Sequence, residues 1–263
     1  MIATLDGVRV HYKSYGSGNE AAVFVHGWTC DHTFWRLQAP VYENRRSLLI
    51  DLPGHGQSDK PEIDYTQEFF ARAVEAVMRD AGVSRAVLIG HSMGMAVGTQ
   101  FLRMFPGKVS GFVIVDGFIP PQPKDDAERQ KTNAQREMMI KTWRSPDYKA
   151  AFVKMIDGMS SPEHTPAALR DEIRTKMTAT PQHVVAGALE GMFTMAPLNN
   201  DERFTIPTLA VMARRQGRAG YDEFLRRYFP KLEYQEWPGV GHFLMMEAPE
   251  KFNTALAAFL DKK

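Results

Sequence analysis

The chain has few of the features that mark secreted, membrane-spanning or nucleic-acid-binding proteins. Its 263 residues include one cysteine, Cys30, so no disulfide can form within the chain. No stretch reaches the about 18 apolar residues that a membrane-spanning helix needs. The net charge is +1, which provides no overall field to attract nucleic acid or an anionic membrane. We therefore expect no nucleic-acid partner, no membrane insertion and a cytoplasmic location.

Motifs for cofactors and metals are also missing. The segment Gly16-Ser17-Gly18 is an isolated glycine pair on a predicted hairpin and does not form a phosphate-binding loop. The eight histidines are scattered, without the spacing of metal ligands. We therefore expect neither a cofactor nor a metal. The sequence gives no indication of the oligomeric state.

Short apolar segments alternate with amphipathic helical patterns over most of the chain. The apolar segments, each typical of a buried parallel strand, are residues 21–27, 46–56, 84–94, 110–117, 207–213 and 232–242. Helical patterns cover residues 66–82, 96–106 and 248–263. This alternation predicts an α/β fold with a mostly parallel central sheet and helices on both faces.

The alternation stops between Phe118 and Asn200, where several helical patterns are separated by prolines. A loop of this length without secondary structure is uncommon. We expect residues 118–200 to form a helical lid. It would be inserted into a core domain made of residues 1–117 and 201–263.

The segment Gly90-His91-Ser92-Met93-Gly94 follows an apolar segment directly and precedes a helical pattern. This is the context of a G-x-S-x-G nucleophile elbow, in which a tight turn exposes the serine hydroxyl above the sheet. The pattern predicts Ser92 as a nucleophile.

Two other strand ends supply groups that are expected to act together with Ser92. His242 lies after the last strand and just before the C-terminal helix, where it is expected to act as the base for Ser92. The backbone N–H of Trp28, which follows His26-Gly27, is expected to form an oxyanion hole with the N–H of Met93. We assign no proton-transfer role to His26.

These three stretches, together with the segment DLPGHGQSD at residues 51–59, resemble the α/β-hydrolase superfamily. The resemblance covers essentially the whole chain and implies the α/β-hydrolase fold. Haloalkane dehalogenases and epoxide hydrolases of this superfamily carry an aspartate nucleophile, so Ser92 excludes those two activities.

The carboxylate that should orient the histidine is not in its usual place. The superfamily usually carries it after the strand at residues 207–213, which corresponds here to Gln216, and an amide cannot carry the charge. A minority of the superfamily carries the acid one strand earlier, which points to Asp116. The alternatives are that Asp116 only caps the turn, and that Asp222 or Glu223, at the start of a helical pattern, supplies the acid.

Several nearby polar residues are interpreted as structural. The basic cluster of Arg214, Arg215 and Arg218 is typical of a solvated face. His55 is expected in a surface turn without a catalytic role. Cys30 is expected to be a small buried hydrophobic residue.

The resemblance and the motifs together predict a serine hydrolase. It would cleave a carboxylic ester or lactone of a hydrophobic small molecule through an acyl-enzyme on Ser92. Aromatic residues are frequent around the motifs, and apolar walls are typical of small-molecule pockets. We expect His32, Trp35, Phe118 and Phe243 to border the substrate pocket.

An oxidoreductase is the principal alternative. Cofactor-independent dioxygenases that cleave N-heteroaromatic rings resemble this chain in the segment HGWTCDH at residues 26–32 and in the placement of the acid. In them, the pair corresponding to His242 and Asp116 deprotonates the substrate. The chain departs from them in its ordinary serine elbow and in Cys30, where they carry a histidine. Carbon–carbon hydrolysis, perhydrolysis and a non-enzymatic receptor remain further alternatives.

Overall fold

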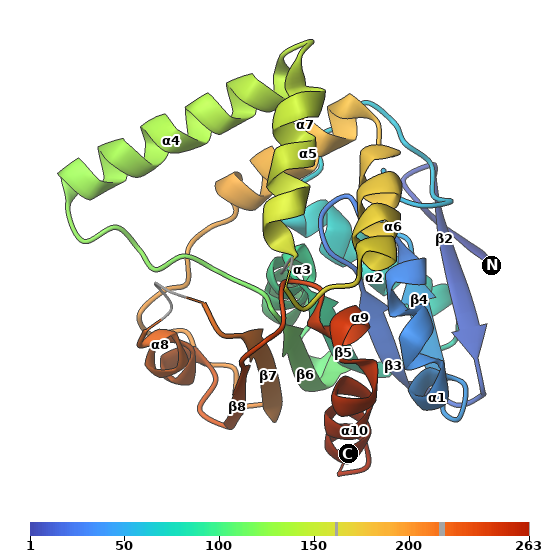
Figure 1. Ribbon diagram of the computed structural model, residues 1–263. Helices are drawn as coiled ribbons and strands as arrows, with labels where there is room; N and C mark the ends of the chain where they lie inside the picture. Colours follow the sequence, from blue (N-terminus) through green and yellow to red (C-terminus); the bar gives the residue numbers. More distant parts are fainter. Residues whose placement is uncertain (161–162, 216–218, 263) are drawn as a thin grey trace.

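The computed structural model describes residues 1–160, 163–215 and 219–262. Within these residues, an eight-stranded sheet has the order β1-β2-β4-β3-β5-β6-β7-β8 (Figure 1). The strands are β1 (Ile2–Leu5), β2 (Val8–Tyr15), β3 (Glu20–Val25), β4 (Ser47–Ile50), β5 (Arg85–His91), β6 (Val109–Val115), β7 (Thr208–Ala213) and β8 (Leu232–Trp237). Each strand expected from an apolar segment is present.

Only one edge of the described sheet is antiparallel. β1 and β2 form a hairpin whose turn residues, Asp6 and Gly7, both have positive φ, as a type I′ turn requires. β2 pairs antiparallel with β4, and the neighbours from β4 to β8 are parallel. The carboxyl ends of these parallel strands lie at one edge, so the loops that follow them gather there.

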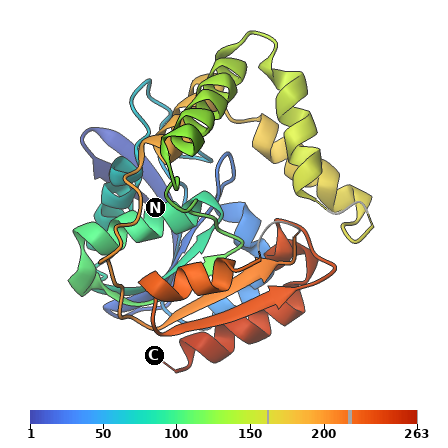
Figure 2. The same cartoon turned by 90° about the vertical axis from the view of Figure 1, so that its left-hand side faces the viewer.

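Helices cover both faces of the sheet. Outside the segment between β6 and β7 they are η1 (His32–Gln38), α1 (Ala39–Tyr42), α2 (Gln67–Asp80), α3 (Met93–Met104), η2 (Pro106–Lys108), α8 (Tyr221–Tyr228), α9 (Leu244–Glu247) and α10 (Pro249–Leu260). A Cβ at Gly98 of α3 would lie 2.6 Å from the ring of Phe112, whereas Phe259 of α10 packs at Gly111. Successive strand residues point to opposite faces, so α3 and α10 lie on opposite sides of the sheet. Figure 2 shows that α8 and α10 also lie on opposite sides of the sheet.

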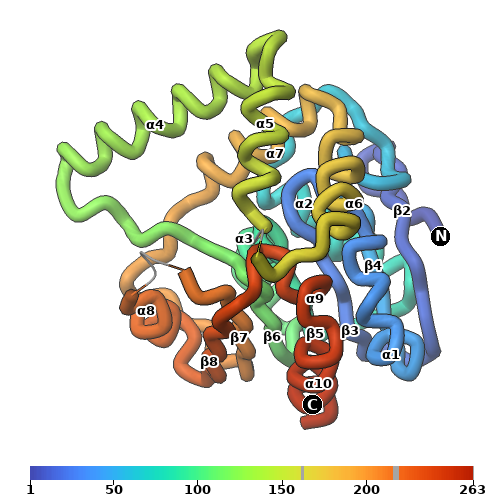
Figure 3. Tube along the Cα trace, in the orientation of Figure 1, coloured from blue at the N-terminus to red at the C-terminus, as the bar shows by residue number. Residues whose placement is uncertain are grey.

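Four helices lie between β6 and β7 in the chain. They are α4 (Asp126–Arg144), α5 (Tyr148–Met159), α6 (Ala167–Thr178) and α7 (Gln182–Thr194). The trace in Figure 3 leaves the sheet after β6, passes through these helices and returns to β7. Contacts join α4 to α7 and α5 to α6. We call this segment the helical insertion. Its treatment as a separate unit spanning residues 118–200 stays a prediction.

The core is built from large side chains on both faces of the sheet. Phe24, Phe112 and Phe252 are completely buried, and each such side chain contributes about 1.5–3 kcal/mol relative to an exposed one. Among the described helices, none is sufficiently long and apolar to cross a bilayer.

Candidate active site

The turn after β5 holds Ser92 in a strained backbone conformation. Its φ of 52° and ψ of −113° are a combination that residues with side chains rarely adopt. A Cβ at Gly90 would lie 2.4 Å from the carbonyl oxygen of Gly94, and a Cβ at Gly94 would lie 2.5 Å from that of Val25. Larger residues would therefore clash on both sides of the serine. The turn fixes Ser92 at the carboxyl edge of the sheet, directly before α3.

The loop after β3 passes close to this turn. A Cβ at Gly27 would lie only 3.1 Å from the Cβ of Ser92. Met93 is the first residue of α3, so its N–H has no acceptor within the helix. In the described part of the chain, the N–H of Trp28 donates no hydrogen bond to a protein acceptor. Trp28 and Met93 thus directly follow Gly27 and Ser92, the two residues at which the loop approaches the turn. An oxyanion hole would need its N–H donors at this place.

His242 contacts Asp116 at the same edge of the sheet. Nδ1 of His242 lies 2.6 Å from Oδ2 of Asp116. A carboxylate only accepts hydrogen bonds, so Nδ1 carries the proton and Nε2 keeps a lone pair. This tautomer can take a proton from a hydroxyl group. Within the described residues no hydrogen bond joins the ring to the half-buried Ser92.

The position of Asp116 is set by two neighbouring strand ends. Its φ is 44°, and its N–H donates to the carbonyl oxygen of Val211 at 2.9 Å. Its Oδ1 accepts the N–H of Ala213 at 3.0 Å. A Cβ at Gly117 would lie 2.4 Å from the Cβ of Met95, so glycine is needed where the chain leaves β6. The buried carboxylate is therefore anchored at the ends of β6 and β7.

The other candidate acids lie elsewhere or cannot be described. Gln216, at the usual position of the acid, is outside the described residues. Asp222 and Glu223 lie in the first turn of α8, where acidic side chains interact favourably with the helix dipole. Among the described residues, Asp116 is the carboxylate that hydrogen-bonds to His242.

Arg214 and Arg215, which follow β7, are both exposed, as expected for a solvated face, but they have different partners. Arg214 is exposed and pairs with Glu236 at 3.1 Å. Arg215 instead donates from Nη2 to Oδ2 of Asp116 at 3.0 Å. Arg218 lies outside the described residues. The sequence does not reveal which of two adjacent arginines turns toward an acid 99 positions away.

His91, for which the sequence predicted no role, supports the backbone of His242. Its Nε2–H donates to the carbonyl oxygen of His242 at 2.9 Å. The N–H of His242 donates in turn to the carbonyl oxygen of Met159, the last residue of α5, at 2.8 Å. Burial lowers the pKa of His91 to about 3, so its ring is neutral at pH 7. The backbone of His242 is thus held by both β5 and the helical insertion.

Comparison with protein families matches residues 22–255 to the family described as "Alpha/beta hydrolase family". The chain belongs to the α/β hydrolase family. The matched segment includes Ser92, Asp116 and His242, and it confirms the resemblance expected from the sequence motifs.

Relatives and solved structures place this α/β hydrolase among several similar proteins. The AB hydrolase superfamily protein YisY of Bacillus subtilis (strain 168) is 26% identical over 98% of this chain and 97% of that protein. Some other curated relatives match over only about a third of their own length. The structure described as "Est816 as an N-Acyl homoserine lactone degrading enzyme" has a TM-score of 0.82 and 26% identity over 98% of this chain and 100% of that one. A thermophilic esterase from Thermogutta terrifontis has a TM-score of 0.83 over 100% of this chain and 98% of that one, but at 22% identity this likeness concerns the fold alone. The family match and the similarity to Est816 support a hydrolase.

The residues expected to border the substrate pocket lie in different environments of the α/β hydrolase. Trp35 and Phe243 are completely buried in the core, each with its ring near His91. Phe118 is 51% exposed just after β6. His32 lines a small cavity. Their contact with a substrate stays a prediction.

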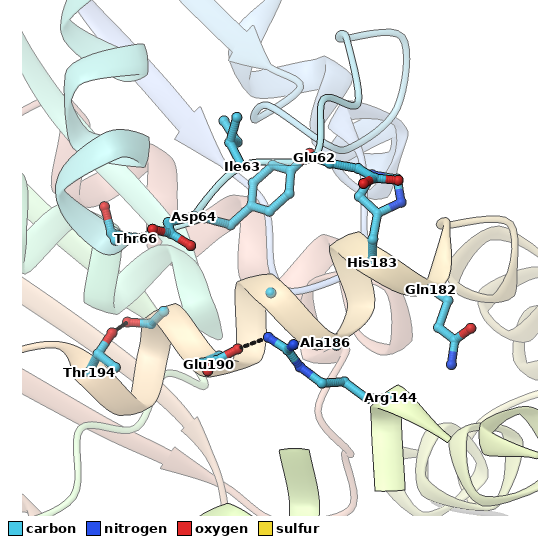
Figure 4. A pocket seen from close by; sticks show the side chains of 13 residues that line it. Glu62, Ile63, Asp64, Thr66, Arg144, Gln182, His183, Ala186, Glu190 and Thr194 are labelled. Carbon is cyan, nitrogen blue, oxygen red and sulfur yellow. Dashed lines mark hydrogen bonds and ion pairs between the residues drawn. The ribbon is translucent and has the colours of Figure 1, made fainter. Parts of the chain in front are cut away.

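The described residues enclose a larger and a smaller cavity. The larger has about 720 Å³ and lies between residues 62–66, α7 and Arg144, which pairs with Glu190 at 2.5 Å (Figure 4). The smaller has about 280 Å³ and is lined by residues 29–33, Lys60 and α6. Neither cavity is lined by Ser92 or His242.

Asp51 brings together side chains that could hold a metal ion. Its carboxylate lies 2.8 Å from Nδ1 of His11 and 2.9 Å from Nδ1 of His32, and the three ligand atoms lie within 4.8 Å of one another. The carboxylate also accepts the N–H groups of His32 and Gln57, so hydrogen bonds alone account for the arrangement. Burial would raise the pKa of Asp51, but these interactions hold it well below its usual range. The spacing of the three residues in the sequence gave no sign of this cluster.

The burial of His55 and Cys30 can be compared with what the sequence predicted. His55 is completely buried, so its assignment to a surface turn is wrong: it packs against Phe70 of α2, and its Nδ1 contacts the carbonyl oxygen of Pro53 at 2.9 Å. Cys30 is buried, as expected. Burial raises the pKa of the Cys30 thiol well above its usual value, which disfavours a thiolate there.

Proposed function

We propose that the protein is a serine hydrolase that cleaves a carboxylic ester or a lactone with a hydrophobic acyl or aryl group. The 2.6 Å contact of His242 with Asp116, at the same sheet edge as Ser92, is the observation that supports this most. It leaves the lone pair of Nε2 available for the hydroxyl proton.

In the proposed reaction, Oγ of Ser92 attacks the carbonyl carbon while Nε2 of His242 takes the hydroxyl proton. The buried carboxylate of Asp116 stabilises the imidazolium that forms. The N–H groups of Trp28 and Met93 bind the oxyanion. Collapse of the tetrahedral intermediate expels the alcohol, which receives the proton from His242. Water then attacks the acyl-enzyme with His242 again as the base, and the carboxylic acid product leaves Ser92 with its proton restored.

The aromatic residues of the helical insertion favour an apolar substrate. The ring of Trp28 contacts those of Trp143 and Phe152, with centroids 6.0 and 5.3 Å apart. In this proposal the insertion acts as a lid, and this cluster forms part of an apolar wall beside the oxyanion hole. The similarity to Est816, described as degrading N-acyl homoserine lactones, makes such lactones the first substrates to test.

The experiment compares hydrolysis of p-nitrophenyl butyrate and of an N-acyl homoserine lactone by wild type and Ser92→Ala. We expect the variant to lose activity by a factor on the order of 10⁴ or more. Ser84→Ala, which changes an exposed serine, serves as the control and should retain wild-type activity. A p-nitrophenyl phosphonate should label Ser92, displacing p-nitrophenolate. Unchanged activity in Ser92→Ala, or a phosphonate adduct at another residue, would refute the proposal.

A second experiment tests the assignment of Asp116 as the catalytic acid. Asp116→Asn should lower kcat by about 10²- to 10⁴-fold, because the amide cannot stabilise the imidazolium. Asp222→Asn is the matched control and should behave like wild type. The assignment is wrong if Asp222→Asn is inactive and Asp116→Asn is not.

The His242–Asp116 pair would also serve the dioxygenase reaction, in which it deprotonates the substrate without help from the serine. Oxygen uptake with a hydroxyquinolone distinguishes the two reactions. Uptake that survives Ser92→Ala, in a protein that hydrolyses no ester, would favour the dioxygenase.

A further inference from the structure

One oxygen atom of the proposed catalytic acid is shared by two nitrogen donors. Oδ2 of Asp116 lies 2.6 Å from Nδ1 of His242 and 3.0 Å from Nη2 of Arg215. The two nitrogen atoms are therefore separated by less than the sum of these distances. A guanidinium is always charged in proteins. A fixed positive charge thus lies next to the imidazole that must accept a proton.

The burial of the acid makes a charged partner useful. The side chain of Asp116 is completely buried, while that of Arg215 is 37% exposed. A buried carboxylate is costly unless it is paired and hydrogen-bonded. Ala213 donates a neutral N–H to Oδ1, and Arg215 adds a full charge at Oδ2. With a neutral His242, Arg215 and Asp116 form a pair of balanced charge.

That balance is lost when the base takes a proton. The imidazolium then shares one carboxylate with the guanidinium, so the three groups carry a net positive charge. Like charges this close disfavour the protonated form. We propose that Arg215 is a positioning residue that holds Asp116 ionised and oriented, and that it weakens the affinity of His242 for a proton. This inference rests on the proposed function of His242 as the base.

Other charged or titratable groups near His242 come from different elements. The ring of His91 lies 4.7 Å from that of His242, centroid to centroid. Burial lowers the pKa of His91 to about 3, so it adds no charge near neutral pH. Glu247 of α9 accepts the N–H of Gly241 and lies close enough to interact with His242, and burial raises its pKa. The charge of Arg215 also lowers the pKa of Glu247, so its removal acts on His242 both directly and through Glu247, whereas Arg215→Lys keeps the charge beside both groups.

The first test is the pH dependence of kcat/KM for p-nitrophenyl butyrate. Arg215→Gln removes the charge, and its acidic limb should move to higher pH by about one unit, the lower end of the shifts caused by a neighbouring charge. Arg215→Lys keeps the charge and should leave the limb close to that of wild type. Arg214→Gln, the matched control, removes a neighbouring arginine that pairs with Glu236 instead. It should not move the limb.

An acidic limb of Arg215→Gln that coincides with that of wild type would overturn the inference. An equal shift in Arg214→Gln would do so too, because the effect would then come from the general surface charge. Unchanged thermal midpoints would show that the variants fold.

The second test does not depend on hydrolysis. The Cε1–H proton signal of His242, identified by its absence in His242→Gln, is followed against pH by nuclear magnetic resonance in the Ser92→Ala protein. Addition of Arg215→Gln should raise the midpoint of this titration by about one unit. An unchanged midpoint refutes the inference even if the protein is an esterase. A raised midpoint in a protein that hydrolyses no ester supports the inference about the charge and refutes the proposed function alone.

Discussion

The indole N–H of Trp28 donates to the backbone carbonyl oxygen of Val185 at 2.9 Å, across 157 positions of the sequence. Trp28 follows β3 and carries one of the proposed oxyanion donors, whereas Val185 belongs to α7 of the helical insertion. One side chain therefore joins the proposed catalytic loop to the segment proposed to act as its lid. Loosening of α7 would be transmitted directly to that loop.

Loss of this hydrogen bond should destabilise the protein. Trp28→Phe keeps an aromatic ring but removes the indole donor to Val185. The carbonyl oxygen of Val185 lies inside α7 and keeps its helical hydrogen bond, so the loss is the net contribution of one hydrogen bond, about 0.5–1.5 kcal/mol. Trp143→Phe is a matched control. Trp143 belongs to the same aromatic cluster, and its indole N–H has no hydrogen-bond partner in the described part of the chain. It therefore loses a similar volume and no hydrogen bond.

Urea unfolding of both variants measures the difference. We expect the free energy of unfolding of Trp28→Phe to be lower than that of Trp143→Phe by about 0.5–1.5 kcal/mol. Equal losses in the two variants would show that the bond to Val185 contributes nothing to stability.

Two helical glycines should respond in opposite ways to alanine. A Cβ at Gly98 of α3 would lie 2.6 Å from the ring of Phe112, which is completely buried and cannot move aside freely. Gly98→Ala should therefore destabilise the protein by about 1–3 kcal/mol, as overpacking of a core does. A Cβ at Gly158 of α5 would meet nothing within 4 Å. Gly158→Ala should stabilise it by about 0.5–1 kcal/mol through helix propensity.

The thermal midpoints of these two variants can be measured in one calorimetric series. The midpoint should fall for Gly98→Ala and rise for Gly158→Ala. A fall of similar size in both would contradict the packing that separates the two positions.

The sequence predicted most of the fold because its signals are local. A parallel strand is buried on both faces, so the strand that ends at Val115 finishes in an apolar run, Phe112 to Val115. The glycines around Ser92 are needed by the turn itself, and this made the elbow recognisable. Prolines marked the limits of the helices in the insertion.

What the sequence did not reveal depends on contacts between distant segments. Arg215 meets Asp116 across 99 positions, and His91 meets the backbone of His242 across 151. Nothing in the residues beside either one indicates such a partner. His55 was misplaced for the same reason, because a polar turn is usually exposed, whereas this one is covered by α2. The shape of a substrate pocket likewise depends on how the helical insertion packs, which no single segment determines.

The buried histidines should make stability depend on pH. Burial lowers the pKa of both His55 and His91 to about 3. In the unfolded chain these rings take up protons near pH 6.5, while in the folded protein they stay neutral until the pH is far lower. Between these limits the unfolded state binds more protons, so the free energy of unfolding falls as the pH falls. Each histidine contributes a slope of up to about 1.4 kcal/mol per pH unit.

Urea unfolding at pH 7.5, 6.5 and 5.5 tests this dependence in wild type and His55→Asn. The asparagine amide can replace Nδ1–H as the donor to the carbonyl oxygen of Pro53, but it does not titrate. The variant should therefore lose less stability than wild type between pH 6.5 and 5.5, by about 1 kcal/mol. His164→Gln, which removes an exposed histidine, should keep the wild-type slope. If His55→Asn also keeps that slope, His55 takes up its proton in the folded protein as readily as in the unfolded chain, and its burial does not control its charge.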